Sequence, residues 1–131
     1  MTTANADKFL ISTLSGDATL MALVQGIYSD HAGKNATYPL IVYQQIGPSE
    51  PAANAYGDSI FDVEPWQVAV VGTGESYVAL ETAADRVRAL LHKSSGAGVL
   101  GCIYTSTQRL AERIGGVEYR NIILEFEIYT Q

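Results

Sequence analysis

The sequence predicts an α+β domain: a mainly antiparallel sheet of about four strands, a long helix packed on one face, and short helices at the N-terminus. Three observations support this fold class. Residues 75–93 carry the apolar period of an amphipathic helix, residues 117–129 alternate apolar and polar side chains, and the expected elements run helices, strand, strand, helix, strand, strand. A length of 131 residues corresponds to one domain, and we find no internal repeat. We therefore treat residues 1–131 as a single domain.

The N-terminal helices are indicated by apolar spacing and by residues that cap helix ends. Asn5–Leu14 places its large apolar side chains on one face, and Gly16 ends this helix. Asp17 is a suitable N-cap because a carboxylate accepts hydrogen bonds from the first free backbone N–H groups of a helix. We expect it to start a second short helix over Ala18–Gln25.

The first two major strands are predicted by branched and aromatic residues. Tyr38–Ile46 is apolar on both parities and is expected to be buried on both faces. Ile60–Val71 is the second strand, and Pro65 within it implies an edge position or a bulge because proline has no N–H for the ladder. Between them Gly47–Ser59 is predicted to be a long loop, which in a compact domain is usually functional or mobile.

The second half of the chain has the clearest patterns. Glu75–Lys93 is the best helix, with apolar residues at spacings of three and four. Val99–Gln108 and Val117–Tyr129 are predicted strands, joined by Arg109–Gly116 as a polar, charged connection. In the last strand one parity is expected inward and the other outward. The inward set is Ile122, Leu124, Phe126 and Ile128, and the outward set is Glu125, Glu127 and Tyr129.

Composition excludes several functional classes. The net charge of −6 argues against sequence-reading of nucleic acid, because phosphate binding needs clustered Lys and Arg. Cys102 is the only cysteine, so it can form no internal disulfide and no tetrahedral metal site by itself, and we expect it in the core. No apolar run approaches ~20 residues, and the N-terminus lacks a signal-peptide pattern, so no membrane segment and no export are expected.

Catalytic chemistry has little support in the sequence. His31 and His92 have no nucleophile beside them, and His92 is explained by the dipole at a helix end. Carboxylate pairs at 62 and 64 and at 125 and 127 each share a strand face, and a solvated sheet face is the usual reason. We therefore predict a protein that is not an enzyme and needs no cofactor or metal.

Self-association is predicted by the surface composition. Only 17% of residues are charged, against about 25% in an average domain, and eight tyrosines supply most of the aromatic content. Interfaces are depleted in charge and enriched in tyrosine. A bland monomeric surface is the alternative that composition leaves open.

Several segments, in order, resemble the tail completion, or tail terminator, proteins of long-tailed bacteriophages. The likeness spans nearly the whole chain, and order and spacing carry it rather than any single motif. The segments are residues 17–24 (DATLMALV) with Ile27 and Tyr28, residues 38–44 (YPLIVYQ), residues 66–71 (WQVAVV), the helix 77–91 and the closing strand 123–129.

The resemblance implies a small α+β subunit of the virion, assembled in the host cytoplasm. It would form a ring, commonly hexameric, at the head-proximal end of the tail tube. There it would stop tube polymerisation and offer a surface to the head–tail connector. DNA would pass through the channel without specific binding. Three alternatives remain open: a head completion or connector ring protein, a small-molecule enzyme on a ferredoxin-like sheet, and a host regulatory binding module.

Two sets of residues follow from this hypothesis. The two polar connections are expected to contact neighbouring subunits, the tail tube protein or the connector, because they are long without a structural need. Their candidate contact residues are Glu50, Tyr56, Asp58, Arg109, Glu112 and Arg113. Acidic residues on outward strand faces are expected to line the channel and repel DNA. These residues are Asp62, Glu64, Glu125 and Glu127.

Overall fold

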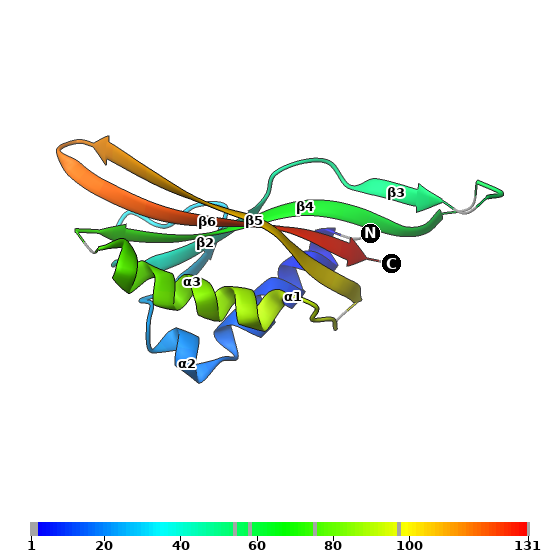
Figure 1. Cartoon of the computed structure of the whole chain (residues 1–131), viewed down its shortest axis with the longest axis horizontal. Coiled ribbons are helices and arrows are strands. Elements are labelled where there is room, and N and C mark those ends of the chain that lie inside the picture. Colours follow the sequence, from blue (N-terminus) through cyan, green and yellow to red (C-terminus); the bar gives the residue numbers. More distant parts are fainter. Residues whose placement is uncertain (1–2, 54, 58, 75, 97, 131) are drawn as a thin grey trace.

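The computed structural model describes residues 3–53, 55–57, 59–74, 76–96 and 98–130. In these residues, three helices lie against a sheet of six strands (Figure 1). The α+β class is confirmed, but the expected four strands and one long helix are too few. The elements are α1 (Thr3–Ser15), α2 (Ala18–Met21), β1 (Ile27–Ser29), β2 (Leu40–Gln45), β3 (Glu50–Ala53), β4 (Ser59–Thr73), α3 (Tyr77–Leu91), β5 (Val99–Ile114) and β6 (Val117–Thr130).

The sheet is antiparallel except at one edge. Its strand order is β1-β2-β4-β6-β5, and β1 and β2 are parallel. The sixth strand, β3, pairs with β4 beyond the point where β2 ends: Gln45 of β2 pairs with Trp66, and Glu50 of β3 pairs with Val63. The sequence missed β3 because a strand of four residues carries too little pattern to stand out.

Pro65 predicted an edge position or a bulge in β4, and this prediction was wrong: the pairing of β4 with β6 runs through Pro65 without a register shift. Strand β4 is central, with β2 and β3 on one side and β6 on the other. The carbonyl of Pro65 accepts from the Ile46 N–H at 2.9 Å, so the position of its missing N–H faces the short gap between β2 and β3. Gly47 fits this gap because a Cβ there would lie 2.8 Å from the proline ring.

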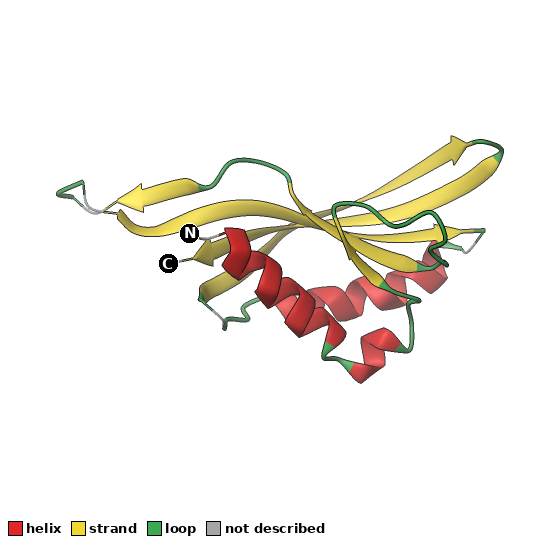
Figure 2. Cartoon of the chain, turned by 180° about the vertical axis from the view of Figure 1, so that it is seen from behind, coloured by secondary structure: helices red, strands yellow, loops and turns green. Residues whose placement is uncertain are grey.

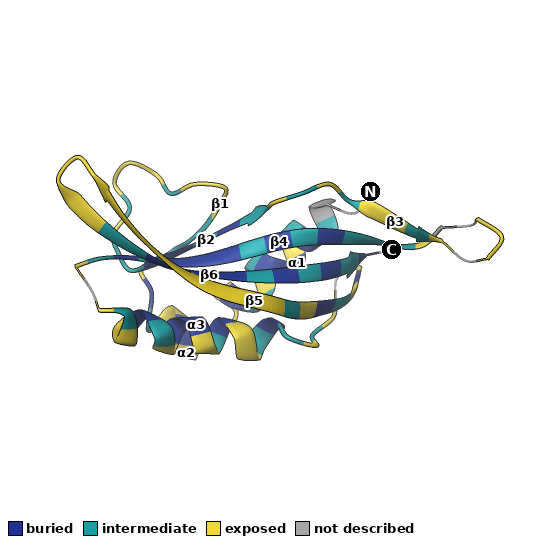
Figure 3. Cartoon of the chain, turned by 45° about the horizontal axis from the view of Figure 1, so that its top comes forward, coloured by how far each residue is buried: buried dark blue, intermediate teal, exposed yellow. Residues whose placement is uncertain are grey.

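One face of the sheet is covered by α1 and α3, and the opposite face carries no helix (Figures 1 and 2). The core lies between the helices and the first face, and it includes the inward residues expected in β6. We call the other face the open face. Because side chains alternate along a strand, the residues Gln67, Glu125, Glu127 and Tyr129 belong to the open face. Figure 3 shows that burial concentrates in the middle of the sheet.

The helices begin and end at residues that differ from the predicted ones: α1 is longer than predicted at both ends, and α2 and α3 are shorter. Helix α2 is a single turn, Ala18–Met21, rather than eight residues, since the chain must leave it to form β1. Its cap was predicted correctly: Asp17 Oδ2 accepts from the Leu20 N–H at 2.8 Å. Helix α3 begins after Ser76, whose hydroxyl accepts from the Ala79 N–H at 3.3 Å. The expected start at Glu75 lies outside the described residues.

Asp17 also ties the N-terminal segment to α3. Its carboxylate binds the Arg86 guanidinium through two oxygens, at 2.7 and 2.8 Å. This side-chain hydrogen bond, with the bond from the Leu20 N–H, lowers the pKa of Asp17 to about 2. No sequence signal joined residues 69 positions apart, so this pair could be found only in the folded chain.

Among the described residues, no helix has the length and apolar character that a membrane crossing needs.

Candidate functional site

The most prominent surface feature is the end of the β5–β6 hairpin, residues 110–119, which we call the β5–β6 arm. Figure 3 shows it as an exposed ribbon that extends past the helices. The prediction of a polar connection over Arg109–Gly116 was wrong, because both strands continue to a two-residue turn at Gly115 and Gly116. Both glycines have positive φ, +58° and +81°, as a tight hairpin turn requires. A Gly-Gly pair between Ile114 and Val117 was the signal that sequence reasoning overlooked.

The arm is attached to the N-terminal end of α3 through an aromatic ring. The Arg109 guanidinium carbon lies 4.8 Å from the centre of the Tyr77 ring, and that of Arg120 lies 5.6 Å from it. Arg109 also forms an ion pair with Glu81. We call Tyr77, Arg109 and Arg120 the Tyr77 clamp. Since these groups are partly exposed, the clamp contributes little to the stability of the fold.

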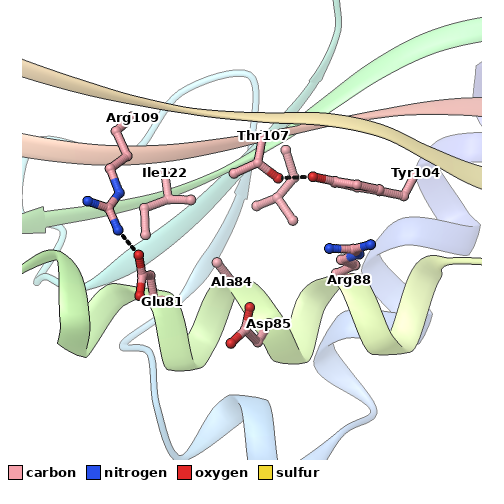
Figure 4. Close-up of a pocket in the computed structure, with 9 residues that line it drawn as sticks. Glu81, Ala84, Asp85, Arg88, Tyr104, Thr107, Arg109 and Ile122 are labelled. Atoms are coloured by element: carbon pink, nitrogen blue, oxygen red, sulfur yellow. Dashed lines mark hydrogen bonds and ion pairs between the residues drawn. The ribbon is translucent and has the colours of Figure 1, made fainter.

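A pocket of about 250 Å³ lies next to the clamp, between α3 and β5 (Figure 4). Apart from Asp85, its polar side chains contact one another or a neighbouring ring. Arg109 reaches Glu81, the Tyr104 hydroxyl bonds Thr107, and Arg88 stacks 4.1 Å from the Tyr104 ring centre. The contacts of Arg109 with Glu81 and of Arg88 with Tyr104 connect α3 to β5 across the pocket. Within the described residues, no group of three or more His, Cys, Asp and Glu is placed to hold a metal ion.

A second hairpin projects from the opposite end of the sheet (Figures 1 and 2). Residues 50–53 and 59–62 form it, and we call it the β3–β4 arm. The prediction of a loop over Gly47–Ser59 was therefore wrong in part, because β3 pairs with β4. Glu50 is exposed on β3, and Tyr56, 90% exposed, lies in the connection between the strands. Asp58 lies outside the described residues.

Glu64 does not face outward, contrary to the prediction. It is fully buried on the helix-covered face of β4. Its carboxylate accepts from the Trp66 indole N–H at 3.0 Å, and the hydroxyls of Ser49 and Thr130 lie 3.4 Å from its other oxygen. Strand parity could have predicted this burial, because Glu64 has the same parity as Trp66 and Val68, which are core residues. Buried carboxylates need such partners.

The other three acidic candidates lie where they contact solvent. Glu125 and Glu127 are half-buried on the open face of β6, and Tyr129 donates to Glu127 at 3.5 Å. Burial, with the nearby Glu127 carboxylate, raises the pKa of Tyr129. Asp62 is half-buried too, but it shares the helix-covered parity with Glu64. Asp62 and the pair on β6 are therefore on opposite faces of the sheet.

The comparisons with known proteins agree with this arrangement. Residues 8–131 match the family described as tail completion protein gp17. The chain belongs to this family. The resemblance drawn from ordered segments is thereby confirmed, and the protein is a structural tail protein by family.

The fold of this tail completion protein is also found in a solved particle. A chain in a structure titled "Virion of native gene transfer agent (GTA) particle" has a TM-score of 0.71, with 20% sequence identity, over 92% of this chain and 90% of that one. At this identity the likeness concerns the fold. Among curated proteins, no sequence matches the chain.

Cys102 and His92, which the sequence analysis considered for chemistry, both have structural roles in this tail completion protein. Cys102 is in the core as predicted, and burial raises its pKa to about 12. His92 was assigned to the helix dipole, but its Nδ1 accepts from the Tyr104 N–H at 3.1 Å and so ties the end of α3 to β5. Sequence reasoning missed Tyr77 and Arg120 as well, because the clamp joins residues that only the folded hairpin brings together.

Proposed function

We propose that this tail completion protein forms a ring, hexameric by family resemblance, at the head-proximal end of the tail tube. There it stops tube polymerisation and presents a surface to the head–tail connector. The observation that carries the proposal is the pair of arms at opposite ends of one sheet (Figure 1). Unlike surfaces at two ends favour head-to-tail contacts, and a ring results when the rotation between copies closes.

Termination follows from the same geometry. A tube grows as long as each new layer repeats the surface of the last one. A ring that matches the tube on one side and differs on the other ends growth, and its free side can bind the connector. The contact residues expected from the sequence remain part of this proposal, and those that the structure describes lie on the two arms or at their bases: Glu50, Tyr56, Arg109, Glu112 and Arg113. Asp58, outside the described residues, is proposed from the sequence alone.

The open face is proposed to face the channel through which DNA passes. Glu125 and Glu127 are the acidic residues of β6 on that face, and a ring repeats them in every copy. Each chain carries a net charge of −6, so phosphates passing within about 8 to 10 Å are repelled. Asp62 lies on the opposite face and is a proposed channel residue only if the ends of β4 turn inward.

Electron microscopy of virions made without the protein tests termination. We expect overlong tails that lack heads. Filled or leaking heads without tails would instead indicate the alternative, a head completion or connector ring.

Channel lining has a separate test. Virions with Glu125→Lys should eject DNA more slowly at low salt, while Glu125→Gln serves as the charge-neutral comparison. Unchanged ejection and infectivity in the lysine variant would contradict the channel-facing role.

A further inference from the structure

An apolar groove of about 310 Å³ lies on the open face, at the end of the sheet away from the β5–β6 arm. The residues that line it come from three adjacent strands, β4, β5 and β6. They are Phe61, Leu100, Gly101, Ile103 and Tyr129. Phe61 and Tyr129 meet edge to face with ring centres 5.5 Å apart, while Leu100 is 50% exposed. Exposed apolar residues gathered in one hollow indicate a binding surface.

The side of the groove toward the sheet centre is acidic. Glu127 pairs across the ladder with Ile103, which lines the groove, and both lie on the open face. Among the described residues, Glu127 has a hydrogen bond from Tyr129 but no ion pair with a cation. A partner for this surface should therefore combine apolar atoms with a positive charge.

The β5–β6 arm has this chemistry. Three of the five arginines of the chain, at 109, 113 and 120, lie on the arm or at its base, on the parity that faces the helices. Arg109 and Arg120 are held by the Tyr77 clamp, and Arg113 near the tip is exposed with no ion pair among the described residues. Ile114 and Val117, on either side of the turn, are exposed apolar residues of the opposite parity.

The direction of the arm also fits. It bends toward the side of the sheet opposite the helices (Figures 1 and 2), and its underside is the helix-facing parity of the two strands, to which Arg113 belongs. If copies follow one another in the same orientation, this underside lies over the open face of the next copy. A contact between the arm of one copy and the open face of the next can repeat from copy to copy and close into a ring. A contact between two open faces would give only a two-fold dimer.

We propose that the β5–β6 arm of each copy docks on the apolar groove of the next, with Arg113 paired to Glu127 and the tip against Phe61 and Ile103. This inference rests on the proposed ring and names the contact that builds it. In the ring, Glu127 belongs to the contact between copies, and Glu125 remains toward the channel.

Charge reversal tests the ion pair. Native mass spectrometry of the purified chain should show closed rings, and Arg113→Glu or Glu127→Arg alone should weaken assembly by about tenfold in concentration. The double variant R113E/E127R should restore rings, because each contact then again joins one positive and one negative side chain, with the charges exchanged. Lys8→Glu, an exposed reversal on α1, is the matched control and should assemble like the unmodified chain.

Cross-linking tests the geometry. A chain with Arg113→Cys and Ile103→Cys should form a ladder of covalent oligomers on oxidation, and neither single variant should do so. The native Cys102 is buried with a raised pKa, so it does not compete. A product that stops at the dimer would overturn the head-to-tail docking.

The two proposals fail in different ways. A chain that remains monomeric at all concentrations, and on assembled tails, would overturn the ring and this contact with it. Rings that form equally well in both single reversal variants, and that the double-cysteine chain does not cross-link, would overturn the arm–groove contact and leave the ring intact.

Discussion

Strands β5 and β6 form one continuous hairpin whose two halves have opposite environments. In the half that lies over the helices, one parity of β6 is buried, with Phe126 and Ile128 in the core. In the arm, both parities of both strands are exposed or half-exposed, as Figure 3 shows. Both halves pair in an antiparallel ladder, and its register shifts, at Val99/Gly101 and at Tyr104/Ser106, lie in the body. The difference indicates that the body of the hairpin supplies stability, and the exposed arm is the part that we propose for contacts between copies.

The largest effect on stability is expected where the same substitution is made in the two halves. Ile128 is fully buried and Ile114 is 61% exposed. Ile128→Ala should lower the free energy of unfolding by about 2 to 5 kcal/mol, because it removes buried methyl groups and leaves a cavity. Ile114→Ala should change it by less than about 0.5 kcal/mol. Urea denaturation of both variants measures the difference.

The comparison would break if the two variants lost similar stability. In that case the arm would be packed in the isolated chain, and its exposure would not mark it as an assembly element.

The next effect concerns the buried carboxylate that anchors the other arm. Glu64 accepts from Trp66 and lies within 3.4 Å of the hydroxyl of Ser49, the residue before β3. Glu64→Ala should cost about 1 to 3 kcal/mol, because the indole N–H loses its buried acceptor. Glu64→Gln keeps an acceptor oxygen and should cost less. Thermal unfolding followed by tryptophan fluorescence reports on both.

Equal losses in Glu64→Ala and Glu64→Gln would show that the charge, rather than the hydrogen bonding, stabilises the site. Hydrogen exchange at residues 50–53 should rise in Glu64→Ala if the carboxylate anchors β3.

A smaller effect is expected at the base of the β5–β6 arm. Tyr77→Ala removes the ring that Arg109 and Arg120 approach and should cost about 0.5 to 1 kcal/mol. Its main consequence should be faster hydrogen exchange in residues 110–119 and weaker assembly. Tyr77→Phe keeps the ring and is the matched control.

If Tyr77→Ala left both exchange and assembly unchanged, the clamp would not determine the direction of the arm. The ladder between β5 and β6 would then be sufficient to hold it.

The smallest effect is a pH dependence in the body. The Arg86 hydrogen bond lowers the pKa of Asp17 to about 2, below its ordinary value of 3.8. A lowered pKa in the folded state stabilises the fold above the ordinary pKa, and this contribution is lost as pH falls from about 4 toward 2. The pair lies at the surface, so the effect is modest. Asp17→Asn should flatten the pH dependence of Tm in this range.

Asp7 should affect the pH dependence of stability in the opposite direction to Asp17, because its pKa is raised. One of its oxygens is buried without a partner, and burial, with Asp30 and Glu64 nearby, raises its pKa. Stability from a raised carboxyl pKa is present in acid and is lost as pH rises through the folded value. Asp7→Asn should therefore raise Tm at neutral pH, and a lower Tm there would contradict the assignment.

Much of the fold follows from local rules that the sequence contains. The Asp17 cap, the amphipathic period of α3 and the alternation of β6 depend on neighbours within a few positions, and all three were predicted. The family was recognised from the order of such segments. Strand β3 and the full length of β5 were missed, because a short or polar strand exists only through the partner that pairs with it.

The sequence by itself determined the fold class, the caps and which residues share a strand face. Only the tertiary structure decided which face the helices cover, and therefore that Glu64 is buried while Glu125 and Glu127 are not. It also decided that Arg109–Gly116 continues as a hairpin arm and that Tyr77 holds its base. The physical reason is that alternation assigns side chains to two faces, whereas burial depends on contacts between segments far apart in the chain.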